Sequence, residues 1–260
     1  MRDEVSADGA RACPHRGARQ RALWAASAAL CLLSLAVMVN GGMPFESGDV
    51  FDLAFFAQVL AMLPPIAYAA ACTDLASSPA RLGIGEVEKA APVASVVLAM
   101  ARVAGTLAVI LLPSLALLLF CGFGQLAHGN LLGPLQALAM FVLVVAPAAL
   151  LAAAMSALAG AALPRAFARI AAAAAWLVVL ALTSFVGVPE AGGGVHLEIA
   201  SDPALQTLFG LPPVLNENVA WAVAPASPLA AFASVAGRVA FAVVLLAAAG
   251  ALSRARGRRR

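Results

Sequence analysis

The sequence predicts an all-α integral membrane protein with six transmembrane helices and both termini in the cytoplasm. The mean hydropathy is +0.96, and 63% of the 260 residues are hydrophobic while only 11% are charged. In soluble domains about a quarter of the residues are charged. Apolar stretches long enough to cross a bilayer recur along the chain, and the basic residues between them fall on one side. A single multi-pass domain in the cell (inner) membrane is therefore expected.

The spans follow from the length that a bilayer requires, which is roughly 20 mostly apolar residues per helix. A cleaved signal peptide is a disfavoured alternative for the first span, because its charged leader is long and its apolar run exceeds the usual 7 to 15 or so residues. Basic tails at 1–21 and 253–260 flank the membrane domain, residues 22–252. Within it the predicted spans are 22–40, 53–72, 103–121, 135–158, 170–188 and 230–252.

The distribution of charge predicts the orientation, because cytoplasmic loops are enriched in Lys and Arg. In a six-span arrangement every basic residue except Arg238 lies in the two tails, in the segment 74–102 or in the loop between spans 4 and 5. A five-span arrangement would place one basic tail outside and is disfavoured for that reason. The opposite side carries Glu46, Asp49, Asp52, Glu190, Glu198, Asp202 and Glu217.

The spans contain prolines but lack central charges. Because proline has no N–H, it is expected to kink a helix or break its hydrogen bonding. No Asp, Glu, His or Lys lies in the middle of a predicted span, although proton relays and cation sites use such residues. Ion-coupled transport by this chain alone is therefore disfavoured. The span prolines are Pro64, Pro65, Pro113, Pro134 and Pro147.

Catalytic and metal-binding motifs are missing from the sequence. His196 begins HLEIA, which lacks the second histidine of a zinc-protease motif. No P-loop is present, because the only lysine, Lys89, lies in GEVEKAA. We therefore predict no enzyme activity, no metal and no cofactor, and an ATPase on another chain if the protein performs energised work. The cysteines fit neither a metal site nor a disulfide framework: Cys13, Cys31, Cys72 and Cys121.

Arg238 stands apart from the other basic residues. Only 14 residues separate it from the basic C-terminal tail, which is about 21 Å of helix against a hydrocarbon core of about 30 Å. It is therefore expected within the outer half of the sixth span. Three interpretations remain open: snorkelling to the headgroups, contact with an anionic substrate, or contact with a carboxylate of another helix.

An island of charge, RLGIGEVEKAAPV, lies between the second and third spans. A short amphipathic turn is expected there, with Glu86, Glu88 and Lys89 on its polar side. Pro92 disfavours helical geometry at the residue before it but fits the first turn of a new helix, so the chain is expected to redirect there. The island reads as a surface segment.

Arg102 supports this placement. A third span that began at Pro92 would carry this arginine about 15 Å into the membrane. A span from Val103 leaves a 19-residue apolar run to Cys121 that can cross by itself. Residues from about 86 to 102 are therefore expected on the cytoplasmic surface.

At this point the chain resembles the type-2 ABC-transporter permeases. These proteins have six spans with both ends inside and a segment G-[TS]-x-E-x-x-x-x-x-P-[VL]-S between spans 2 and 3, with a basic residue ten positions after the proline. Ala94 replaces the motif's serine, and the usual acidic residues ahead of the glycine are missing apart from the distant Asp74. The residues in register are Gly83, Glu86, Pro92, Val93 and Arg102.

The resemblance implies a coupling element that contacts a separate ATP-binding subunit, and a second permease chain in a homodimer or heterodimer. ATP hydrolysis would then drive transport, with export the expected direction. The basic tails are explained by topology, so no nucleic-acid partner is expected. The alternatives are an ion-coupled secondary transporter and a structural or assembly subunit. The implied coupling residues are Gly83, Glu86, Glu88, Lys89, Pro92 and Arg102.

Overall fold

The computed structural model of the chain describes residues 13–38, 46–74, 95–181, 202–209 and 227–258. All regular structure in these ranges is helical, as the sequence predicts. The elements, in chain order, are α2 (Cys13–Met38), α3 (Val50–Met62), α4 (Pro64–Ala71), η1 (Cys72–Asp74), α7 (Ser95–Ile110), α8 (Leu112–Gly124), η2 (Gln125–His128), α9 (Gly133–Met140), the π-helical η3 (Phe141–Val145), α10 (Ala146–Ala162), α11 (Arg165–Ala181), α12 (Asp202–Phe209) and α13 (Pro228–Arg258).

The helices define a multi-span membrane protein. Four stretches are long and apolar enough to cross a bilayer, and a fifth is added if α7 and α8, which meet at 47°, count as one span. The predicted span at 170–188 corresponds to the shorter apolar helix Ala166–Leu180 in α11, and the description of this region stops at residue 181. The sixth crossing therefore stays a prediction. The four stretches are Arg21–Met38, Val50–Ala71, Gly133–Ala162 and Ala231–Arg256.

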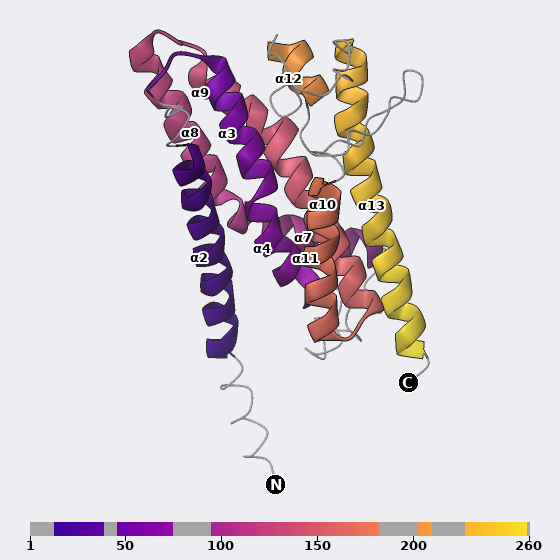
Figure 1. Cartoon of the computed structure of the whole chain (residues 1–260). Coiled ribbons are helices and arrows are strands. Elements are labelled where there is room, and N and C mark those ends of the chain that lie inside the picture. Colours follow the sequence, from indigo (N-terminus) through magenta and orange to yellow (C-terminus); the bar gives the residue numbers. More distant parts are fainter. Residues whose placement is uncertain (1–12, 39–45, 75–94, 182–201, 210–226, 259–260) are drawn as a thin grey trace.

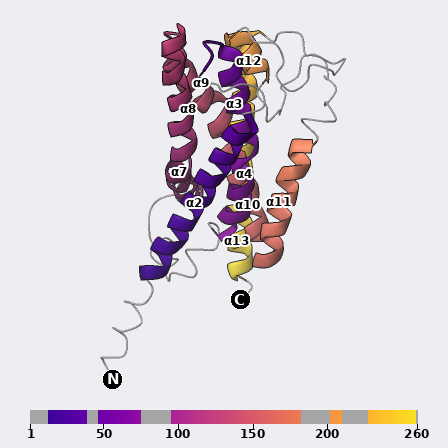
Figure 2. The ribbon, with the colours of Figure 1, turned by 60° about the vertical axis from the view of Figure 1, so that its left-hand side comes forward.

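The two ends of the bundle differ in charge. Helix α2 begins and α13 ends at the same end, where α10 also ends and α11 begins (Figures 1 and 2). We call this the basic end, because Arg21 and Arg169 lie in the first halves of α2 and α11 and Arg256 lies in the last turn of α13. Helix α3 begins at the opposite end (Figure 1). We call that the acidic end, because Asp49 caps α3 and Asp52 lies in its first turn.

The helix breaks lie at the predicted prolines. Pro64 follows the break at Leu63 and opens α4, and Pro113 lies in the first turn of α8, just after the 47° bend. Pro134 opens α9 in the same way, and Pro147 follows the π-helical segment at the start of α10. Because proline has no N–H to donate, the hydrogen-bond ladder ends on its N-terminal side. The predicted interruptions are present at Pro64, Pro113 and Pro147, whereas Pro134 lies at the start of α9 and interrupts no span.

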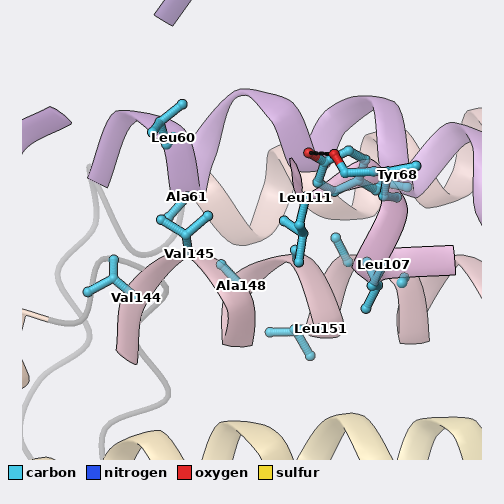
Figure 3. Packing of buried hydrophobic residues seen from close by; sticks show 14 of the residues in the cluster. Leu60, Ala61, Tyr68, Leu107, Leu111, Val144, Val145, Ala148 and Leu151 are labelled. Carbon is cyan, nitrogen blue, oxygen red and sulfur yellow. Dashed lines mark hydrogen bonds between the residues drawn. The ribbon is translucent and has the colours of Figure 1, made fainter. Parts of the chain in front are cut away.

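Helix α10 occupies the centre of the bundle and packs against α4, α11 and α13. Most of its buried residues are alanines, whose small side chains let neighbouring backbones approach closely in the membrane. The π-helical η3, which precedes α10, and α10 itself face α3, α4 and α7 in the core. Figure 3 shows this packing, with Val144, Val145, Ala148 and Leu151 opposite Leu60, Ala61, Tyr68, Leu107 and Leu111.

Among the glycines that the structure describes, Gly160 of α10 leaves the least room for a Cβ atom, because the backbone of Thr73 in η1 lies against it. A Cβ atom at Gly160 would overlap the Thr73 carbonyl oxygen. Only glycine fits this position, because the atom in the way belongs to the backbone and cannot rotate aside.

We expect Gly160→Ala to destabilise the protein, because either η1 or α10 must shift. Overpacking of this kind costs about 1–3 kcal/mol. Gly105→Ala is the matched control, since no atom lies within 4 Å of a Cβ atom built at Gly105, and alanine is intrinsically better in a helix by about 0.5–1 kcal/mol. Thermal unfolding in one detergent measures both variants. Equal stability of the two would contradict the close approach.

Candidate functional site

The predicted coupling residues divide between two parts of the chain. Gly83, Glu86, Glu88, Lys89 and Pro92 lie outside the described residues. Arg102 lies inside them, half-buried on α7.

The helix that carries Arg102 starts before the predicted span boundary at Val103. Helix α7 already begins at Ser95, because SVVLAMAR contains no helix breaker. The Arg102 carbonyl accepts a hydrogen bond from Thr106 Oγ1 at 2.9 Å. The charged island is therefore followed, within a few residues, by a continuous helix that enters the bundle.

A buried polar cluster lies where α7 bends into α8. The Ile110 carbonyl accepts hydrogen bonds from Ser27 Oγ at 2.7 Å and Tyr68 Oη at 3.3 Å. The two hydroxyl oxygens are themselves 2.8 Å apart. Inside a bilayer a backbone carbonyl needs a protein partner, because lipid provides none. Ser27 of α2 and Tyr68 of α4 thus stabilise the bend between α7 and α8.

The cluster extends further along α2. Cys31 Sγ lies 3.1 Å from Ser114 Oγ of α8. Ser27, Cys31 and Ser114 are fully buried, and Ser27 and Cys31 lie one turn apart on the same face of α2. Polar contacts therefore join α2 to both halves of the bent pair.

The break between α3 and α4 is stabilised in the same manner. The amide of Ile66 donates to the Leu63 carbonyl instead of continuing the α-helical ladder. The Met62 carbonyl accepts a hydrogen bond from Trp176 Nε1 at 3.1 Å. Trp176 lies on α11 and its side chain is fully buried. A second broken span is thus held by a donor from another helix.

Sequence reasoning missed both sets of donors. Two features of the sequence could have indicated them. Prolines show where backbone carbonyls lose their N–H partners, and a side chain with a hydrogen-bond donor inside an apolar run can replace such a partner. Tyr68 is the only tyrosine in the chain, and Trp176 follows a run of five alanines.

We expect Ser27→Ala and Tyr68→Phe to be non-additive. Each single change leaves the Ile110 carbonyl one donor, so each should cost about 1 kcal/mol or less. The double change leaves the buried Ile110 carbonyl without a side-chain donor, which should lower the free energy of unfolding by a further 1–3 kcal/mol or so. A double-mutant cycle from thermal unfolding tests this coupling. Strict additivity would show that the two hydroxyls do not share the carbonyl.

Arg238 lies inside the helix packing. Its side chain is fully buried, and it occupies the stripe of α13 that includes Ala231, Ser234 and Ala242, all of them buried. A snorkelling arginine keeps its guanidinium in contact with water or headgroups, which this burial does not allow. A buried charge is stabilised by polar partners within the protein. Contact with an anionic substrate or with a carboxylate of another helix stays a prediction for Arg238.

The described residues contain no group of three or more His, Cys, Asp or Glu that could hold a metal ion. Their polar groups instead stabilise broken helices within the bundle.

Comparison with protein families, with curated proteins and with solved structures identified no match for this chain. The helices establish the class of protein, which is a multi-span membrane protein.

Proposed function

We propose that this chain is the membrane-spanning permease subunit of an ABC transporter. A separate ATP-binding subunit hydrolyses ATP, a second permease chain completes the transport path, and the complex exports its substrate. The observation that carries the proposal is the register of Gly83, Glu86, Pro92 and Arg102 in the segment that leads into α7.

The arrangement of the helices supports this proposal. The proposed topology has six spans, and the fifth is the predicted span 170–188, of which α11 contains the first part. An even number of crossings fits the position of the α2 start and the α13 end at one end of the bundle (Figure 1). The arginines at that end favour a cytoplasmic location for it. The charged island, which follows η1 and precedes α7, then faces the cytoplasm, where a soluble ATPase subunit can bind it.

The described helices also suggest how the segment would act on the membrane domain. Helix α7 has 16 residues and is therefore about 24 Å long. A displacement of its first turn moves the helix as a rigid rod toward the bend at Leu111. The bend joins α2, α4 and α7 through the Ile110 carbonyl. A movement of the coupling segment would thereby reach three spans, and rigid-body movement of packed helices is a common way to alternate between two states.

Affinity purification from native membranes in mild detergent tests the proposal. We expect a P-loop ATPase to co-purify with the tagged chain, and the purified complex to hydrolyse ATP. An identically tagged, unrelated multi-span protein is the control for non-specific capture. A well-folded chain that repeatedly purifies without any P-loop ATPase, also after cross-linking in the membrane, would contradict the proposal.

The topology has its own test. Reporter fusions within 189–227 should report a position outside the cytoplasm, and fusions at either terminus a cytoplasmic one. A cytoplasmic report from the 189–227 fusions would overturn the six-span arrangement.

A further inference from the structure

An apolar groove of about 580 Å³ lies between α10, α11 and α13. Helix α10 forms its floor from Leu151 to Ala162, α11 contributes mainly alanines and Val179 on one side, and α13 contributes Phe241 and Leu245 on the other. Its volume is in the range of about 300–1,000 Å³ that is usual for ligand-binding sites. All of the lining side chains are apolar, so the groove suits a hydrocarbon.

The groove has the length of one bilayer leaflet. From Leu151 to Ala162 the floor of α10 rises by about 17 Å, which is roughly half of a 30 Å hydrocarbon core. Ala162 is the last residue of α10, at the basic end of the bundle (Figures 1 and 2). The groove therefore runs from the membrane surface at the basic end to about the bilayer midplane.

A guanidinium lies at the surface end of the groove. Arg256 Nη2 donates a hydrogen bond to the carbonyl oxygen of Ala162, and Ala162 lines the groove. Arg256 is on the same face of α13 as Phe241 and Leu245, because the spacings of 15 and 11 residues are close to whole numbers of helical turns. A guanidinium carries five N–H donors, so the contact with Ala162 leaves donors for a phosphate group.

The surroundings of this end are strongly basic. Besides Arg256, Arg169 of α11 lies at this end, where α11 begins at Arg165 and α13 ends at Arg258. No Asp or Glu side chain that the structure describes lies at this end. The net positive charge favours an anionic headgroup over a zwitterionic one.

We propose that this groove is a binding site for an anionic phospholipid. One acyl chain lies along α10 between α11 and α13, and the headgroup phosphate binds Arg256 at the basic end. The site does not depend on the proposed transport function. A lipid held between three helices would act as a structural ligand of the bundle.

Phosphatidylglycerol and phosphatidylcholine with identical acyl chains are the probes. Native mass spectrometry of the full chain, titrated with each lipid, measures the apparent affinity. We expect phosphatidylglycerol to bind more tightly, and Arg256→Gln to weaken its binding about fivefold, since one basic residue near an anionic headgroup contributes a factor of this size. Arg254→Gln is the matched control, because Arg254 is only two residues away but on the other side of α13.

Filling the groove tests the acyl-chain position. Ala175 lines the groove, whereas Ala174 is exposed on another face of α11. We expect Ala175→Phe to abolish retention of the lipid and Ala174→Phe to leave it unchanged. In the unaltered chain, a photoreactive phosphatidylglycerol should label peptides that contain 151–162 or 171–179.

Several results would overturn the proposal. Equal affinity for the two lipids would show that Arg256 does not bind an anionic headgroup. Equal lipid retention by the two phenylalanine variants would show that the acyl chain does not lie in the groove. Photolabelling confined to other helices would also show that the lipid does not bind in the groove. This result does not depend on whether Ala175→Phe folds. A change in oligomeric state in Ala175→Phe with unchanged lipid binding would instead make the groove an interface between copies of the chain.

Discussion

Reversing the charges of Glu86, Glu88 and Lys89 together should reduce co-purification of the ATPase subunit at least tenfold and abolish the ATP hydrolysis that depends on this chain. Complementary charges at an interface set partner choice, and placing like charges opposite one another costs several kcal/mol. Since 1.4 kcal/mol is a factor of ten in affinity, three reversals are more than enough. The measurement is the amount of ATPase captured per tagged chain, together with its activity.

The control for this experiment must change the net charge equally. Glu86→Lys, Glu88→Lys and Lys89→Glu together raise the net charge by the same amount as the single change Glu46→Lys. Glu46 is exposed and precedes α3 at the acidic end. We expect Glu46→Lys to leave capture and activity unchanged. If the triple variant also binds and activates the ATPase normally, the island is not the coupling element.

Trp176→Ala should cause the largest loss of stability among the single substitutions. Trp176 is one of the largest fully buried side chains, and its removal leaves a cavity between α11 and the break in the second span. Truncations from tryptophan to alanine in protein cores cost about 3–5 kcal/mol. For a chain of this size this corresponds to a fall in Tm of roughly 6–20 °C. Thermal unfolding in nanodiscs provides the measurement.

Two companion variants separate the causes. Trp176→Phe keeps most of the packing but removes the donor to the Met62 carbonyl, so it should lose about 1–3 kcal/mol. Leu177→Ala changes the next residue, which is about half exposed and faces away from the core, and should be nearly neutral. A Trp176→Phe variant as stable as the unaltered chain would show that the Met62 carbonyl does not need this donor.

The proline positions allowed the helix breaks to be predicted, because a residue without N–H interrupts the ladder whatever its tertiary surroundings. The partners of the freed carbonyls could not be predicted in this way. Ser27 is 83 residues from Ile110, and Trp176 is 114 residues from Met62. Contacts at such separations depend on how the helices pack, and apolar residues on all sides of a span conceal which face is buried.

The same limit explains Arg238. Its distance from the basic tail gave its depth along α13, but the sequence around it is apolar on every side. Only the packing of α13 reveals that Arg238 shares a buried stripe with Ser234 and Ala242. The coupling residues were predicted from the pattern of the loop, and apart from Arg102 they lie outside the described residues.

The central claim is that an ATPase subunit binds this chain at the charged island. A photo-cross-linking amino acid at position 89, activated in native membranes, tests it most directly, with position 46 at the acidic end as the control. We predict a cross-linked product that joins the chain to a P-loop ATPase from position 89 and none from position 46. A membrane-inserted chain that forms no ATPase adduct from position 89, or from any other position between 86 and 92, would contradict the claim.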